Sequence, residues 1–173
     1  MVVTILRMTD LYEGHGWKLW IEEAVLPDGR PSSMVRARRP DSVHILAFTD
    51  KQKILMLREY RAFYGQWIWM LPSGRVDKET DLLQTAQREL QEETGYISDD
   101  IRFWCTSSHT ESVVMSNHFF IAKKLRQSRL PQDEDELIEV HDLSLDEAIE
   151  KVLHSPVIPT PSAFGLLRYA QNI

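Results

Sequence analysis

One stretch, residues 74–96, constrains the fold more than any other part of the chain. It reads GRVDKETDLLQTAQRELQEETGY and joins a glycine-led loop to a run of good helix formers. From Lys78 to Thr94 the run contains no glycine or proline, and Gly95 stands where a glycine commonly ends a helix. The stretch therefore predicts a loop followed by a long amphipathic helix. Its apolar positions, which are expected to form one stripe toward the core, are Leu82, Leu83, Ala86 and Leu90.

The rest of the chain alternates strand-like runs with two further helical stretches. Residues 17–25 and 33–39 flank a Pro-Asp-Gly turn and predict a β-hairpin. Ser144 and Glu147 have the spacing of a capping box at the start of a helix. Because strands outnumber helices, we expect an α/β sandwich with a mixed sheet. The other predicted strands are 43–48, 53–60, 67–71, 101–106, 118–125 and 137–143, and the other helices are 145–153 and 162–170.

Composition narrows the classes of protein to which the chain can belong. It has 173 residues, 43% of them apolar, and no internal repeat, which indicates an ordinary globular chain. A net charge of −6 argues against general binding of nucleic acid polymers, although a small anionic ligand needs only a local cationic pocket. The single Cys105 excludes an internal disulfide and favours a cytoplasmic location. No apolar run approaches the ~18 residues needed to span a bilayer, so no membrane association is expected.

Three glutamates on the predicted helix carry the chemical information. Glu89, Glu92 and Glu93 stand at i, i+3 and i+4, so they project from one side of a helix. Their mutual repulsion is unfavourable unless a cation lies between them. Mg²⁺ prefers oxygen ligands and is commonly shared between carboxylates and the phosphates of a substrate. The alternative is a solvated acidic helix face, and the spacing alone does not decide between the two.

The loop and helix together resemble the signature of the Nudix hydrolases. Gly74 and the run RELQEETGY (88–96) match that signature in residue type and spacing. Thr80 departs from it, because the signature has a glutamate there, and Glu79 lies one position early. The resemblance implies the Nudix α/β/α sandwich with a mixed β-sheet, here with an N-terminal β-hairpin extension. On this basis the chain divides into an N-terminal hairpin region, 1–40, and a Nudix hydrolase domain, 41–173.

The resemblance also implies roles for individual residues. Glu89, Glu92 and Glu93 would bind Mg²⁺, or Mn²⁺ in its place, and the backbone carbonyl of Ser73 would be a further ligand. Arg88 would orient the glutamates by ion pairing, whereas its alternative role is that of an ordinary surface arginine.

Beyond the signature, the chain is most similar to the ADP-ribose and ADP-sugar pyrophosphatase branch of the family. In that branch Trp17 would stack on the nucleobase, although it could equally be a core or interface aromatic. Arg61, and Arg39 or its neighbour Arg38, would bind the diphosphate, with a solvated charge run as the alternative. Dimers made through exchanged N-terminal strands are expected. The stretches that carry this likeness are Gly16-Trp17, MLREYR (56–61), LPSG (71–74) and DEDELIEV (133–140).

An acidic stretch precedes the last predicted strand. The branch carries a catalytic glutamate in this loop, and the pattern before LIEV assigns that role to Glu136, with Glu134 as the alternative. This residue would take a proton from the attacking water. A plain acidic loop is the competing interpretation.

The sequence thus predicts an Mg²⁺-dependent hydrolase of a small nucleoside diphosphate derivative, most similar to ADP-ribose or an ADP-sugar. The products would be a nucleoside monophosphate and a sugar phosphate. Met70, Thr80 and the 107–110 segment depart from the branch, so other Nudix substrates are alternatives: a GDP-sugar, a dinucleoside polyphosphate or a nucleoside triphosphate. A non-catalytic ligand sensor with the same fold is a further alternative.

Overall fold

The computed structural model describes residues 3–76, 81–128 and 137–171. The chain forms two compact units, and each is described by itself. The first combines residues 1–41 with 107–117, and the second combines 42–106 with 118–173. The first unit therefore includes a segment that returns from the middle of the chain.

The first unit is a twisted sheet with the strand order β1-β2-β3-β9. The predicted hairpin is present as an antiparallel pair of strands that starts at the pairing of Val25 with Pro31. An additional strand precedes it and pairs antiparallel with β2 through a turn at His15 and Gly16, both with positive φ. Among the described residues of this unit, Trp20 is the single buried apolar side chain. Its strands are β1 (Thr4–Gly14), β2 (Trp17–Val25), β3 (Pro31–Arg38) and β9 (Val113–Val114).

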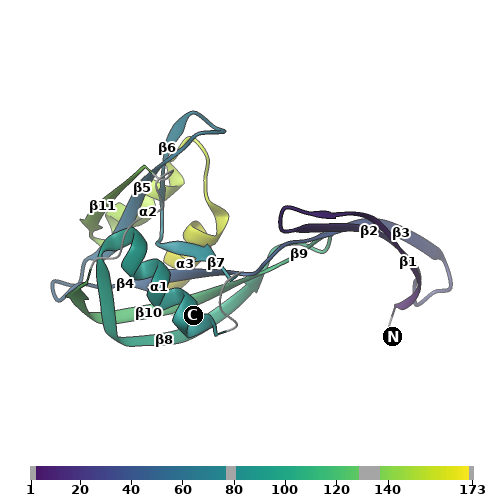
Figure 1. The fold of residues 1–173 in the computed structure, drawn as a ribbon, viewed down its shortest axis with the longest axis horizontal. Helices are drawn as coiled ribbons and strands as arrows, with labels where there is room; N and C mark the ends of the chain where they lie inside the picture. The colour runs from purple at the N-terminus through teal and green to yellow at the C-terminus, as the bar shows by residue number, and fades with distance from the viewer. Residues whose placement is uncertain (1–2, 77–80, 129–136, 172–173) are drawn as a thin grey trace. The chain divides into compact units, whose positions relative to one another are not determined.

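The second unit contains two sheets and three helices, drawn in Figure 1. One sheet has the order β7-β4-β10-β8 and the other has the order β11-β5-β6. The strands are β4 (Ser42–Ala47), β5 (Ile54–Arg61), β6 (Gln66–Met70), β7 (Ser73–Arg75), β8 (Tyr96–Ser108), β10 (Ser116–Gln127) and β11 (Ile138–Leu143). The helices are α1 (Leu82–Thr94), α2 (Leu145–Leu153) and α3 (Thr160–Ala170).

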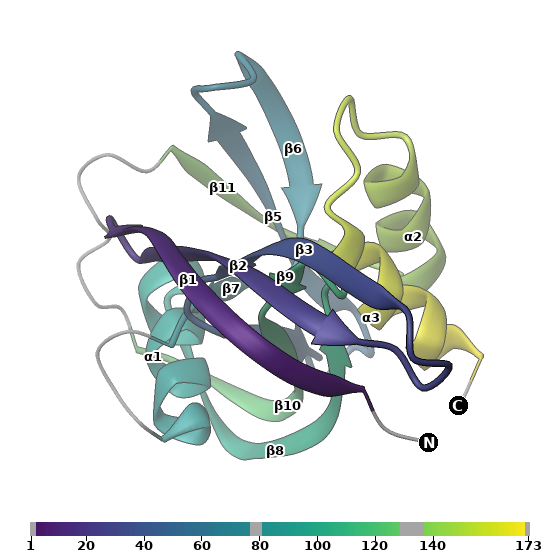
Figure 2. The ribbon, with the colours of Figure 1, turned by 90° about the vertical axis from the view of Figure 1, so that its right-hand side faces the viewer.

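Alternation along β4 explains why helices cover both faces of the strands. Val43 and Ile45 belong to a core cluster that contains Ala86 of α1. Leu46 belongs to a second cluster that contains Val152 of α2. Because successive strand residues point to opposite faces, one strand supplies both cores. Figures 1 and 2 show α1 on one side of the strands and α2 and α3 on the other. The predicted α/β/α sandwich with mixed strand directions is confirmed.

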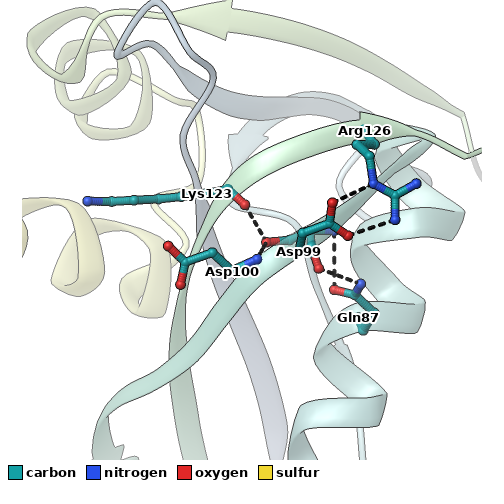
Figure 3. A network of polar contacts seen from close by, with 6 residues as sticks. Gln87, Asp99, Asp100, Lys123 and Arg126 are labelled. Carbon is teal, nitrogen blue, oxygen red and sulfur yellow. Dashed lines mark hydrogen bonds and ion pairs between the residues drawn. The ribbon is translucent and has the colours of Figure 1, made fainter.

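Polar contacts also bind α1 to its neighbouring strands (Figure 3). The side-chain amide of Gln87 donates to the carbonyl of Ser98 in β8 at 2.9 Å. The Ser98 hydroxyl donates in turn to the carbonyl of Lys123 in β10 at 2.6 Å. Next to this contact, Arg126 of β10 donates two hydrogen bonds of 2.6 and 2.7 Å to Asp99 of β8. The helix is therefore held to β8 by a polar contact at Gln87 as well as by its apolar face.

Two details of α1 differ from the sequence expectation. The helix begins at Leu82, because the Asp81 side chain caps it by accepting from the N–H groups of Leu83 and Gln84. Leu83 is 42% exposed and does not belong to the buried stripe. Adjacent helix residues lie ~100° apart, so Leu82 and Leu83 cannot both face the core fully. In contrast, α2 has the predicted bounds and the predicted capping box of Ser144 and Glu147.

Candidate functional site

Helix α1 ends where the sequence predicts, and this end fixes the positions of the three glutamates. Gly95 adopts the left-handed conformation with φ 75°, and its N–H donates to the carbonyl of Gln91. A glycine tolerates this conformation without steric cost. Helical phase then places Glu93 three residues after the buried Leu90, on the same stripe as the core residues.

Glu93 is a buried carboxylate, with 6% of the residue exposed. Its Oε2 accepts a 2.8 Å hydrogen bond from the backbone N–H of Ser73. Ser73 begins β7, which pairs antiparallel with β4 through the partners Ser73 and His44. A side chain of the helix is thus joined to the backbone of the loop strand that starts the signature.

Gly74 leaves the space that the carboxyl group of Glu89 occupies. A Cβ built on Gly74 would lie 1.9 Å from the carboxyl carbon of Glu89, which is far closer than any real contact. The glycine is therefore required by a close approach, since its φ is not positive. The sequence places Gly74 and the helix glutamates in one signature, and this close approach gives a steric reason for a glycine at position 74.

Arg88 lies between two of the glutamates. Its Nη2 is 2.7 Å from Oε1 of Glu89, and its Nη1 is 2.6 Å from Oε2 of Glu92. All three side chains are largely shielded from solvent. One guanidinium therefore offsets the repulsion of two carboxylates, because its planar fork places a separate nitrogen beside each of them.

The three glutamates offer oxygen donors to a divalent cation. Within residues 3–76, 81–128 and 137–171, no three His, Cys, Asp or Glu side chains are gathered ready to hold a metal ion. In this arrangement Glu89 and Glu92 turn to Arg88, and Glu93 turns to the N–H of Ser73. The chemistry of the donors nevertheless fits a hard cation, because the donors are carboxylate oxygens beside one another on a single helix face.

A cavity of about 600 Å³ adjoins the end of α1. Glu92 and Glu93 form one part of its lining, and Ile138 and Val140 of β11 form another. Its remaining described lining residues are Thr94, Gly95, Tyr96, Gln127 and Ser128. A small ligand can therefore reach two of the three glutamates from this side.

Arg61 lies at the end of β5, and its side chain is 45% exposed. Its Nη2 is 2.9 Å from Oε2 of Glu59 and 3.4 Å from the sulfur of Met70. Sequence reasoning missed Glu59. The sequence did contain a signal for it. Alternate residues of a strand point to the same face, so Glu59 shares the face of the apolar residues Leu55 and Leu57.

Trp17 and Arg39 come together in the first unit. The guanidinium carbon of Arg39 lies 5.0 Å from the centre of the Trp17 ring, which is a cation–π contact. Trp17 is partly exposed and does not belong to a core cluster of the described residues. Arg36 instead forms an ion pair with Glu22 at 3.0 Å. Thr80, Glu134 and Glu136 lie outside the described residues.

Comparison with protein families settles the class of the chain. The NUDIX domain model matches residues 38–160. The chain belongs to the Nudix family. It is a Nudix hydrolase, and the prediction made from Gly74 and residues 88–96 is confirmed.

Three curated relatives are similar to this protein over most of the chain. An ADP-ribose pyrophosphatase of Bacillus subtilis is 30% identical over 162 residues, which cover 90% of this chain and 86% of that protein. A methanol dehydrogenase activator of Bacillus methanolicus is 32% identical over 85% of this chain and 81% of its own. A CMP-5'-(N-acetyl-N-hydroxy-3-aminopropyl)phosphonate hydrolase of Streptomyces rubellomurinus is 31% identical over 85% of this chain and 72% of its own.

A solved structure shares the Nudix fold seen here. A crystal structure of an ADP compounds hydrolase superimposes with a TM-score of 0.80 and 22% sequence identity, covering 99% of this chain and 95% of that one. Among the described residues, none of the helices is both long and apolar enough to cross a membrane.

Proposed function

We propose that this Nudix hydrolase cleaves the pyrophosphate linkage of ADP-ribose or an ADP-sugar. One observation carries the proposal: Glu89, Glu92 and Glu93 are held by Gly74, Arg88 and the N–H of Ser73 beside a cavity large enough for a small ligand. That arrangement contains the parts needed to bind a charged diphosphate through a cation. The similarity to an ADP-ribose pyrophosphatase over 90% of the chain supports the choice of substrate.

The metal site in this proposal consists of Glu89, Glu92, Glu93 and the backbone carbonyl of Ser73. Mg²⁺, or Mn²⁺ in its place, neutralises charge on the diphosphate and increases the acidity of water when it is bound. The fold keeps the three carboxylates on one shielded face of α1, and their side chains would turn from Arg88 and the Ser73 N–H toward the cation. Arg88 keeps Glu89 and Glu92 from separating.

The reaction is hydrolysis at one phosphorus of the diphosphate. A water oxygen forms a bond to that phosphorus, the bond to the bridging oxygen breaks, and the second phosphate leaves with that oxygen. Glu136 would take the proton of the attacking water, with Glu134 as the alternative. Ser128 and Ile138, which flank the segment that contains both, line the same cavity as Glu92 and Glu93.

Three residues would contact the substrate in this proposal: Arg61, Trp17 and Arg39. Arg61 would bind a phosphate oxygen through the part of its guanidinium that faces solvent. Trp17 would stack on the nucleobase, an interaction of ~1–3 kcal/mol per base. Arg39, which lies over the same ring, would pair with the diphosphate once the base displaces it from Trp17.

A homodimer through the N-terminal strands is part of the proposal. β1 is the edge of its sheet, and its apolar side chains are exposed. An exposed apolar edge strand is a surface that favours pairing with another chain. The apolar residues concerned are Ile5, Leu6, Met8, Leu11 and Tyr12.

A different nucleoside diphosphate derivative is the second candidate substrate. The 31% identity to a hydrolase of a CMP derivative supports a substrate with a base other than adenine. The departures from the ADP-ribose branch at Met70 and at 107–110 also support a different substrate. A cytoplasmic location stays a prediction from the single cysteine.

A substrate panel tests the proposal directly. The purified chain is incubated with Mg²⁺ and, separately, ADP-ribose, ADP-glucose, GDP-mannose, diadenosine polyphosphates and deoxynucleoside triphosphates. Chromatography then identifies the products. We expect AMP and ribose 5-phosphate from ADP-ribose, with no product after chelation of the metal. Turnover of another compound at a higher kcat/KM would replace ADP-ribose as the substrate, and no turnover of any of them would overturn the proposed activity.

A further inference from the structure

Glu59 is a charged residue in a core position that the metal site does not use. It lies in β5 two residues after Leu57, and only 5% of it is exposed. Leu55, with the same phase on this strand, packs in the cluster that contains Ala86 and Leu90 of α1. Side chains at 55, 57, 59 and 61 therefore face the side of the sheet that α1 covers. A carboxylate rarely occupies such a position without a charged partner.

Its charged partner is Arg61, the next residue on the same face. Oε2 of Glu59 lies 2.9 Å from Nη2 of Arg61. The carboxylate is the buried end of this pair and the guanidinium is the exposed end, since the two side chains are 7% and 45% exposed. The pair therefore runs from the core toward solvent.

Met70 supplies a second contact to the same nitrogen. In the pairing of β5 with β6, Met70 stands opposite Leu57, so it shares the face of Glu59 and Arg61. Its sulfur lies 3.4 Å from Nη2 of Arg61. A thioether is a weak acceptor without charge, so the electrostatic hold on Arg61 comes from Glu59.

Both contacts use one nitrogen of a group that has five N–H donors. In the described part of the chain, they are the only polar side-chain contacts of the Arg61 guanidinium. The remaining donors lie on a side chain that is nearly half exposed. An arginine held by one corner in this way presents its other N–H groups to an anion in a fixed orientation.

We infer that Glu59 is a positioning residue, which fixes the Arg61 guanidinium for binding the diphosphate group of the substrate. The inference rests on the proposed function, because that proposal assigns the diphosphate to Arg61. It adds a buried carboxylate that acts through Arg61 and touches neither substrate nor metal. Loss of the Glu59 charge should therefore weaken ligand binding only as long as Arg61 is present.

A double-mutant cycle on ADP binding tests this dependence. Titration calorimetry gives the Kd of ADP for the wild-type chain, Glu59→Gln, Arg61→Gln and the double variant. Glu59→Gln preserves the size of the side chain, so the variant is expected to fold. Each single substitution should raise the Kd by about tenfold, and the double variant should bind no more weakly than Arg61→Gln, because coupled residues are not additive. Glu139→Gln is the matched control, since Glu139 pairs with Arg58 at 2.9 Å on the opposite face of the same sheet.

The kinetic readout separates this inference from the proposed activity. With ADP-ribose, Glu59→Gln should raise KM about tenfold and change kcat by less than about threefold, as expected for loss of a binding contact. A Kd that rises in the double variant by the product of the two single effects would overturn the inference, and so would wild-type affinity in Glu59→Gln. Failure of the wild-type chain to bind ADP would also overturn the inference. A coupled loss of affinity in a chain that hydrolyses nothing would retain the role of Glu59 and remove the proposed function alone.

Discussion

The backbone N–H of Ser73 and the Oε2 of Glu93 are joined by a 2.8 Å hydrogen bond. This bond links the first residue of β7, directly before the signature glycine, to the last glutamate of α1. It joins two residues that are 20 positions apart in the sequence. A buried carboxylate is stable there because it accepts a backbone donor in place of water.

The first prediction concerns the charge of Glu93. Glu93→Gln keeps an oxygen that can accept the Ser73 hydrogen bond, but it removes the negative charge that would bind the metal. We expect kcat for ADP-ribose to fall by about a hundredfold or more, with little change in the melting temperature. Glu150→Gln, on the exposed face of α2, is the control. Near wild-type turnover in Glu93→Gln would remove Glu93 from the metal site.

The second prediction concerns the space at Gly74. In Gly74→Ala the new methyl group would occupy the position of the Glu89 carboxyl group, so that side chain must move. Because the displaced atoms are the end of a flexible side chain, the fold should survive. We expect kcat/KM to fall about tenfold or more at an almost unchanged melting temperature. Ser73→Ala, which keeps the backbone N–H, is the control. Full activity of Gly74→Ala would show that the position of Glu89 is not critical.

The third prediction concerns the fork of Arg88. Lysine retains the charge but has one terminal nitrogen, so Arg88→Lys cannot place two separate nitrogens, one beside Glu89 and one beside Glu92, as the planar guanidinium does. We expect activity at saturating substrate to require about tenfold more Mg²⁺. The measurement is the initial rate against Mg²⁺ concentration. An unchanged Mg²⁺ dependence in the lysine variant would contradict an orienting role.

The fourth prediction concerns the pH dependence of stability. Hydrogen bonding to Arg126 lowers the pKa of Asp99 below its ordinary value of 3.8. A folded-state pKa below the unfolded one means that the pair stabilises the protein above about pH 4 and loses this effect as pH falls through the folded-state pKa. Both groups are exposed, so the effect is small.

Arg126→Gln isolates this contribution. Its melting temperature should lie below that of the wild type at pH 7, and the difference should shrink as the pH is lowered from 4 toward 2. Arg102→Gln removes a neighbouring exposed charge that has no ion pair in the described residues. A difference for Arg126→Gln that grows on acidification would have the wrong sign for this mechanism.

The fifth prediction concerns assembly through β1. Leu6 and Leu11 are exposed apolar residues on this edge strand. Leu6→Lys combined with Leu11→Lys should shift the mass measured by light scattering from a dimer to a monomer, because lysine on an edge strand opposes pairing. Leu153→Lys on α2 changes an equally apolar exposed residue elsewhere. A wild-type chain that is already monomeric would contradict the proposed dimer.

The helix of the signature shows what the sequence alone can reveal. Its end at Gly95 and the glutamate spacing follow from local rules, namely αL preference and helical phase, that depend little on the rest of the fold. Its first residue and the exposure of Leu83 depend on which side of the helix meets the strands. Only the packed structure determines that contact.

Three features were not predicted from the sequence, namely β1, the pairing of β9 with β3 and the burial of Glu59, and each has its own physical reason. β1 shows no alternation of buried and exposed residues, since it pairs with β2 through its backbone while its side chains stay exposed. The pairing of β9 with β3 joins residues 113–114 to 37–38, and such a short parallel contact leaves no sequence pattern. The phase of β5 indicates the buried side for Glu59, but a glutamate is usually exposed, so its residue type argued against the core position that the structure shows.

The network of Gln87, Ser98 and Lys123 has a consequence for how the site responds to its ligands. It ties the middle of α1 to two strands, in addition to the cap at Asp81 and the turn at Gly95. A helix restrained at three levels opens only when much of the unit opens, so its amide hydrogens should exchange among the slowest in the chain. Metal binding would then rearrange the side chains of the glutamates and leave the backbone protection pattern of α1 unchanged.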